Sequence, residues 1–92
     1  MVYNLVVLSQ AILEIEDALD WYEEQKYGLG YELLDEIDFC YLKLTKRPEH
    51  YSYINASYRR IKTERFPYVL IYSLNGDTVT VNSFRHVKRK PL

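Results

Sequence analysis

The fold of this chain is decided by residues 58–91, YRRIKTERFPYVLIYSLNGDTVTVNSFRHVKRKP, in which two apolar runs meet at Asn75-Gly76. An Asn-Gly pair between apolar runs is typical of a β-hairpin with a type I′ turn, because that turn needs positive φ at both central positions. We therefore expect strands at residues 67–74 and 78–84, joined as a hairpin. The preceding residues, 58–64, predict a third strand that carries mostly charged side chains.

The beginning of the chain predicts a strand followed by a helix. Residues 2–8 are rich in β-branched and aromatic side chains and stop at Ser9, which can cap a helix. From Ala11 to about Lys26, apolar residues recur at helical spacing between acidic residues, as in an amphipathic helix. Gly28-Leu29-Gly30 then predicts a tight turn.

A second amphipathic helix follows that turn and is expected to end at Pro48, with Lys43, Lys46 and Arg47 suited to its C-terminal dipole. Residues 49–56 are polar and tyrosine-rich and predict a loop. The element order is therefore β-α-α-β-β-β. This order indicates an α+β fold, with the N-terminal strand and the helical hairpin packed on one face of a small antiparallel sheet.

The size and composition of the chain restrict its class. Its 92 residues, 48% of them apolar, fit a single domain over residues 1–92. The longest apolar run, residues 68–72, is far shorter than the roughly 18 residues of a membrane span. The single cysteine, Cys40, cannot form an internal disulfide and falls in the apolar stripe of the second helix, so we expect a core residue and a cytoplasmic protein.

The formal net charge of only −1 conceals a division between the two parts of the chain. Residues 1–50 hold four basic and eleven acidic side chains, whereas residues 51–92 hold eight basic side chains and only Glu64 and Asp77 as acids. Such asymmetry suggests that one surface meets an anionic partner. The basic residues bracket the predicted sheet: Arg59, Arg60, Lys62 and Arg65 enter it, and Arg85, His86, Lys88, Arg89 and Lys90 leave it.

Antiparallel pairing of these strands would bring their ends together as a positive rim suited to phosphates or carboxylates. The alternation of a strand allows at most half of the residues around Arg59 and Arg60 to share a face. The alternative interpretation is an edge strand whose charges only prevent aggregation.

His86 is the candidate for proton transfer, since it stands beside the basic cluster. A lone histidine without a paired carboxylate is nevertheless more often a structural residue. His50, His86 and Cys40 lack ligand-like spacing, so no metal is expected, and no motif for a cofactor is present. Three tyrosines near the basic residues could stack on nucleic-acid bases: Tyr51, Tyr53 and Tyr58.

The segments RRIKTERFPYVLIYSL and TVTVNSFRHVKRKP resemble the C-terminal half of the RelE/ParE family of bacterial type II toxins. The specific features are FPY opening the apolar strand, Tyr72 closing it, and His86 followed by basic residues and Pro91. The predicted order of elements resembles the fold of that family over essentially the whole chain.

The resemblance implies a toxin of a plasmid-stabilisation type that is neutralised by a cognate antitoxin. RelE-like members cleave mRNA on the ribosome, and ParE-like members inhibit DNA gyrase. RelE-like enzymes carry an Arg three residues before the closing Tyr, and here that position is Val69. An apolar side chain cannot neutralise charge developing on a phosphate, and the chain has no terminal Tyr, so the ParE-like branch is favoured.

We therefore expect a ParE-like toxin that binds gyrase rather than an enzyme. The residues expected to contact the target or the antitoxin are Arg60, Lys62, Arg85, His86, Lys88 and Arg89. One alternative is a ribosome-dependent endoribonuclease, with His86 as acid or base and Arg60 or Arg85 on the phosphate. Another is an inactive family member that only binds its antitoxin.

Overall fold

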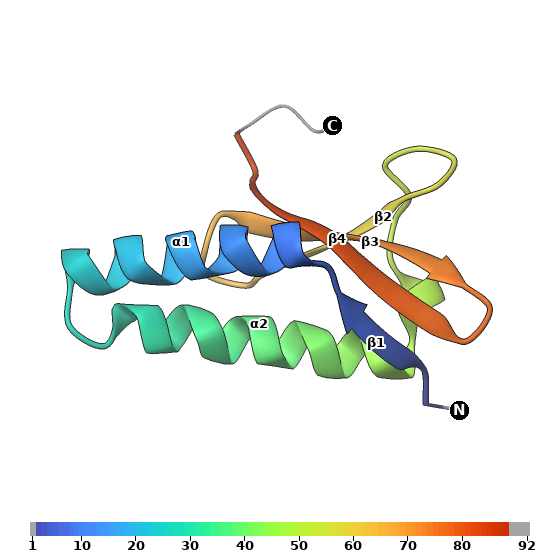
Figure 1. Cartoon of the computed structure of the whole chain (residues 1–92), viewed down its shortest axis with the longest axis horizontal. Coiled ribbons are helices and arrows are strands. Elements are labelled where there is room, and N and C mark those ends of the chain that lie inside the picture. The colour runs from blue at the N-terminus through green and yellow to red at the C-terminus, as the bar shows by residue number, and fades with distance from the viewer. Residues whose placement is uncertain (1, 89–92) are drawn as a thin grey trace.

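The computed structural model describes residues 2–88 and has the expected α+β order of elements (Figure 1). Two long antiparallel helices follow the first strand and lie against one face of the sheet, which the remaining strands complete. The elements are β1 (Asn4–Val7), α1 (Ser9–Gln25), α2 (Leu29–Lys46), a 3-10 turn η1 (Pro48–His50), β2 (Arg59–Lys62), β3 (Tyr68–Asn75) and β4 (Thr78–His86).

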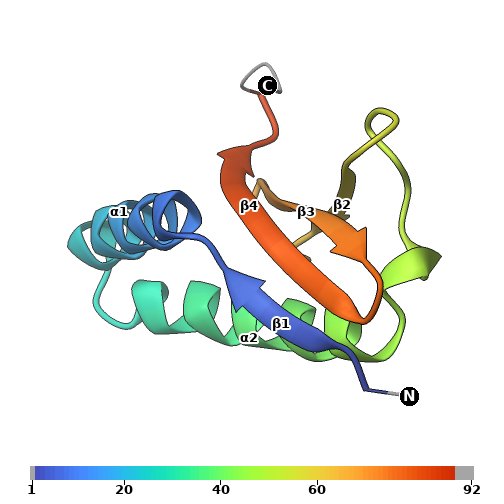
Figure 2. The ribbon, with the colours of Figure 1, turned by 45° about the vertical axis from the view of Figure 1, so that its right-hand side comes forward.

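The sheet has the strand order β1-β4-β3-β2 and is mixed (Figure 2). Strands β2, β3 and β4 are antiparallel, as expected, but β1 pairs in parallel with β4, with Leu5 opposite Val79. The sheet is therefore not wholly antiparallel. The helical hairpin provides the long connection that allows β1 to join the sheet at the edge beside the last strand.

The β3–β4 hairpin has a different turn from the predicted one. Asn75 is the last paired residue of β3 and lies opposite Thr78, so the two central residues are Gly76 and Asp77. Only Gly76, with φ of 62°, has a positive φ. A glycine at the first central position followed by a residue of ordinary φ is the arrangement of a type II′ turn.

The pairing of β3 with β4 shifts between Ile71 and Tyr72. Ile71 lies opposite Ser83, but Tyr72 lies opposite Val81, so Asn82 is an extra residue in β4. Such a bulge reverses the alternation of the strand. Consequently Val81 faces the helices, and Ser83 faces the other side of the sheet.

The turn between the helices is also placed differently from the prediction. Gly28, with φ of 87°, precedes α2, while Gly30 lies inside the helix and is buried. The Glu23 carboxylate of α1 accepts hydrogen bonds from the N–H groups of Gly28 (2.9 Å) and Gly30 (3.0 Å). A carboxylate here satisfies free N–H groups at the positive end of α2. Ser9 is the first residue of α1 rather than its cap, and no side chain caps this end.

The core lies between the helical hairpin and the covered face of the sheet. Its buried members include Leu33, Ile37 and Cys40 of α2 and Leu70 and Tyr72 of β3. Cys40 is only 2% exposed, as expected for a core residue, and burial raises the pKa of its thiol from 9.0 to about 11.

We expect Gly30→Ala to destabilise the protein by about 1–3 kcal/mol, because a Cβ on Gly30 would lie 2.8 Å from the backbone oxygen of Leu19. At an uncrowded helical position the same change would stabilise by about 1 kcal/mol. Urea denaturation followed by circular dichroism measures the difference. A gain in stability would contradict the close approach of α1 and α2.

The Cys40 thiol should react with a disulfide reagent at about pH 8 at least about 100-fold more slowly in the native protein than in the urea-unfolded protein. The raised pKa alone removes most of the thiolate, and burial restricts access further. Since the folded state holds this proton more tightly, the stability contributed is present below about pH 9 and is lost as the pH rises toward 11. Equal reaction rates in the two states would show that Cys40 is accessible.

Candidate binding face

The face of the sheet turned away from the core, here called the outer face, brings two rows of residues together. One row is Lys62, Val69 and Arg85, and the other is Arg60, Ile71 and Ser83. Neighbouring residues on the same strands, such as Ile61, Leu70 and Phe84, belong to the core, so these six side chains point the other way. Arg60 and Lys62 thus share a face, as the alternation of a strand requires.

The middle of the outer face is apolar. Val69 and Ile71 are 8% and 2% exposed, although they do not belong to the main core. They line a small cavity of about 70 Å³ together with Ile54, Arg60, Arg85, His86 and Val87. An anionic group held between Arg60 and Arg85 would therefore contact an apolar floor rather than a cation.

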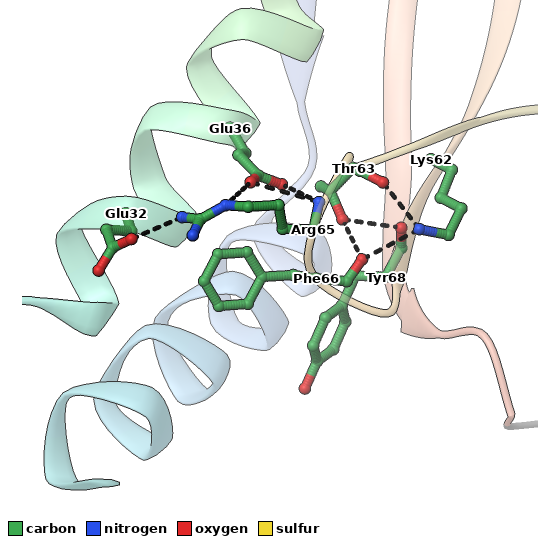
Figure 3. A network of polar contacts seen from close by, with 7 residues as sticks. All are labelled: Glu32, Glu36, Lys62, Thr63, Arg65, Phe66 and Tyr68. Atoms are coloured by element: carbon green, nitrogen blue, oxygen red, sulfur yellow. Dashed lines mark hydrogen bonds and ion pairs between the residues drawn. The ribbon is translucent and has the colours of Figure 1, made fainter. Parts of the chain in front are cut away.

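The predicted cations differ in whether their charge is available. Arg60 is exposed and forms no ion pair within residues 2–88. The Lys62 ammonium instead donates to the carbonyls of Thr63 (2.9 Å) and Phe66 (3.3 Å), as Figure 3 shows. The Thr63 hydroxyl also donates to the Phe66 carbonyl, at 2.6 Å. Lys62 therefore stabilises the segment between β2 and β3 through hydrogen bonds to its backbone.

Arg65 is also occupied within the fold. Its guanidinium pairs with Glu32 (2.6 Å) and Glu36 (3.2 Å) of α2, and its backbone N–H donates to Glu36 (Figure 3). The hydrogen bonds that Arg65 donates to Glu32 and Glu36 raise the pKa of Arg65. This residue ties the β2–β3 connection to α2 and is turned away from the outer face.

Arg59 supports the segment that precedes β2. It donates to the carbonyls of Glu49 and Tyr51, each at 2.8 Å, and lies 3.9 Å from the ring centre of Tyr53. Nearby, the buried Tyr72 hydroxyl donates to the Pro48 carbonyl, and burial raises the pKa of Tyr72. One face of the Tyr53 ring is thus covered by a guanidinium, which leaves less of it for stacking on a base than the sequence suggested.

Arg85 lies at the other margin of the outer face and is partly engaged. Its side chain is 21% exposed, and its Nε lies 3.6 Å from a carboxylate oxygen of Glu14 in α1. The other oxygen of Glu14 accepts a hydrogen bond from the Phe84 N–H, at 3.0 Å. The sequence did not predict this contact, because nothing local shows that α1 reaches the open edge of β4.

His86 borders the small cavity that Arg60 and Arg85 also line, but its ring packs elsewhere. It lies opposite Tyr68, and its ring packs edge-on against the Tyr68 ring at 5.2 Å, on the side of the sheet that the helices cover. Its Nδ1 accepts a hydrogen bond from the N–H of the exposed Lys88. Arg89, the remaining predicted contact residue, lies outside the described residues.

Within residues 2–88, no group of three or more His, Cys, Asp or Glu side chains is arranged to hold a metal ion. Across the same residues, neither helix combines the length and apolar character needed to cross a membrane.

Comparison with solved structures gives an extensive match. A chain from the structure described as "Chromosomal ParDE TA system from P. aeruginosa" superposes with a TM-score of 0.79, covering 95% of this chain and 98% of that one. The chain has a RelE/ParE-like fold. The sequences are only 14% identical, so the likeness concerns the fold, and it confirms the fold inferred from residues 59–91. No protein-family model and no curated protein sequence matches the chain.

In this RelE/ParE-like fold, Val69 stands in the same row as Lys62 and Arg85, on the strand between them. The position at which RelE-like enzymes are expected to carry an Arg is therefore the middle of the outer face. Because this position is a valine, the positive charges of the outer face lie only on the residues at its margins, such as Lys62 and Arg85.

We expect Lys62→Ala to lower stability by about 1 kcal/mol, because two loop carbonyls lose their donor. Arg60→Ala is the matched control on the same strand and face, and should change stability by less than about 0.5 kcal/mol. Urea denaturation of the two variants measures both effects. A larger loss for Arg60→Ala would contradict the assignment of Lys62 as the structural cation.

Proposed function

We propose that this chain is the toxin of a type II toxin–antitoxin pair, that it arrests growth by binding DNA gyrase, and that a cognate antitoxin neutralises it. The observation that carries the proposal is the superposition on a chain of a ParDE toxin–antitoxin structure over nearly the full length of both chains. The outer face, with Arg60 and Arg85 at the margins of an apolar floor and the exposed Lys88 just after β4, supplies the contact surface.

Two features of the site support binding rather than catalysis. His86 borders the same small cavity as Arg60 and Arg85, but its imidazole packs edge-on against Tyr68 and forms no hydrogen bond with either guanidinium within residues 2–88. Val69 places an apolar side chain at the middle of the outer face, where a developing negative charge would require a donor.

The same face suits an acidic antitoxin. Arg60 and Lys88 are exposed cations, and residues 51–92 carry eight basic side chains against two acidic ones. Complementary charge accelerates encounter and orients the partner. Val69 and Ile71 at the centre are only 8% and 2% exposed, so the charged margin carries the contact. The antitoxin and gyrase would then compete for one surface.

Expression of the chain alone in a bacterial host, with labelled thymidine and labelled methionine followed in parallel, tests the proposal. Gyrase inhibition requires that thymidine incorporation fall first. An earlier fall in methionine incorporation, with new 5′ ends on transcripts, would favour the endoribonuclease instead. No effect on either would contradict toxicity and leave the inactive antitoxin-binding protein.

The double variant Arg60→Gln/Lys88→Gln should relieve growth arrest and raise the Kd for purified gyrase about tenfold or more, since interface arginines commonly contribute about 2 kcal/mol. Both residues are exposed, so folding should be unaffected by circular dichroism. Lys26→Gln/Lys46→Gln, which removes the same charge from the helix ends, is the control and should remain toxic. Full toxicity of the first variant would show that the outer face is not the contact surface.

A further inference from the structure

A second hollow lies on the other side of the sheet, between α1 and the ends of β3 and β4. We call it the α1 pocket. It has a volume of about 420 Å³ and is lined chiefly by Glu14, Asp17, Trp21, Tyr22, Tyr68 and His86. None of the cations of the outer face lines it, so the inference drawn from it does not depend on the proposed function.

The walls of the α1 pocket are aromatic, and their rings pack against one another. Trp21 packs edge-on against Tyr22, with ring centres 4.9 Å apart, and Tyr22 is in turn edge-on to Tyr68 at 6.1 Å. Tyr68 stacks on Phe84 at 4.6 Å with the rings nearly parallel. These rings contact one another in series, and Trp21 remains 55% exposed beside the hollow. Such preformed walls lower the entropic cost of binding.

The polar lining of the α1 pocket is anionic. Glu14, Asp17 and Trp21 follow one another at helical spacing and share a face of α1. The Glu14 carboxylate is fixed by the Phe84 N–H and by Arg85, whereas the exposed Asp17 forms no ion pair within residues 2–88. His86 Nδ1 accepts a hydrogen bond from the Lys88 N–H.

We propose that the α1 pocket binds an arginine side chain presented by a polypeptide partner. A guanidinium is planar, stacks on aromatic rings and donates in parallel to a carboxylate, so Trp21 and Asp17 together match it better than they match an ammonium or an apolar group. The volume accommodates the aliphatic stem and adjoining backbone as well as the guanidinium. Residues 1–50, with eleven acidic side chains against four basic ones, favour a basic segment over an acidic one.

Trp21 is the only tryptophan of the chain, so its fluorescence reports on the α1 pocket directly. The full chain is titrated with the blocked tripeptide acetyl-Gly-Arg-Gly-amide at constant ionic strength and about pH 8, where imidazole is neutral. The proposal requires a saturable change with a Kd of roughly 1 mM, as expected for a single anchoring side chain. The citrulline tripeptide, which has the same shape without the charge, should bind at least about tenfold more weakly.

Asp17→Asn should weaken binding of the arginine tripeptide about threefold or more, as expected for one exposed charged contact. Glu16→Gln, which removes an exposed charge from the neighbouring position, is the control and should leave the Kd unchanged. Equal binding of the arginine and citrulline tripeptides, or no saturable change with either, would overturn the proposal. Binding that appears only after Arg89 and Lys90 are replaced by Gln would identify this chain's own tail as the occupant and would also overturn it.

Discussion

One extra residue in β4, Asn82, determines which side chains of that strand face the helices and which face the other side. Val79 and Val81 are buried in the core, and uninterrupted alternation would direct Ser83 and Arg85 to the same side. Because the pairing shifts at Asn82, Phe84 enters the core instead, and Arg85 joins Lys62 and Val69 on the outer face. This shift in the alternation of β4 places Arg85 at the margin of the outer face. It also places Phe84 where it stacks on Tyr68 and lines the α1 pocket.

Much of the fold could be predicted because its signals are local. The periodicity of both helices, the apolar strand β3 and the glycine at the hairpin turn identified the elements and their order. The sequence could not show that β1 lies parallel to β4, because strand pairing depends on how the helical hairpin returns the chain to the sheet. The exact turn was also missed, since Asn75-Gly76 and Gly76-Asp77 are both compatible with a two-residue loop, and the register of the strands selected the second pair.

The candidate site was predicted less completely, because charge is visible in a sequence but its partners are not. Arg65 is paired with carboxylates 29 and 33 residues earlier, and Arg59 with carbonyls of the segment before β2. Lys62 bonds carbonyls only one and four residues ahead, yet this depends on the conformation of the connection that follows it. Of the described cations near β2, only Arg60 makes neither an ion pair nor a side-chain hydrogen bond within the fold, so fewer side chains are free to contact a partner than the sequence suggests.

Glu14 connects the two sides of the sheet through one carboxylate. One oxygen contacts the backbone of Phe84 and the other lies near Arg85, while the same side chain lines the α1 pocket. An anion that draws the Arg85 guanidinium toward the outer face leaves Glu14 with one partner fewer and makes the α1 pocket more negative. Thermodynamic linkage then requires the effect to be reciprocal. If an anionic ligand increases the affinity of the α1 pocket for a cation by some factor, the cation increases the affinity of the outer face for the anion by the same factor. Two partners of opposite charge would therefore bind this small domain cooperatively without touching each other.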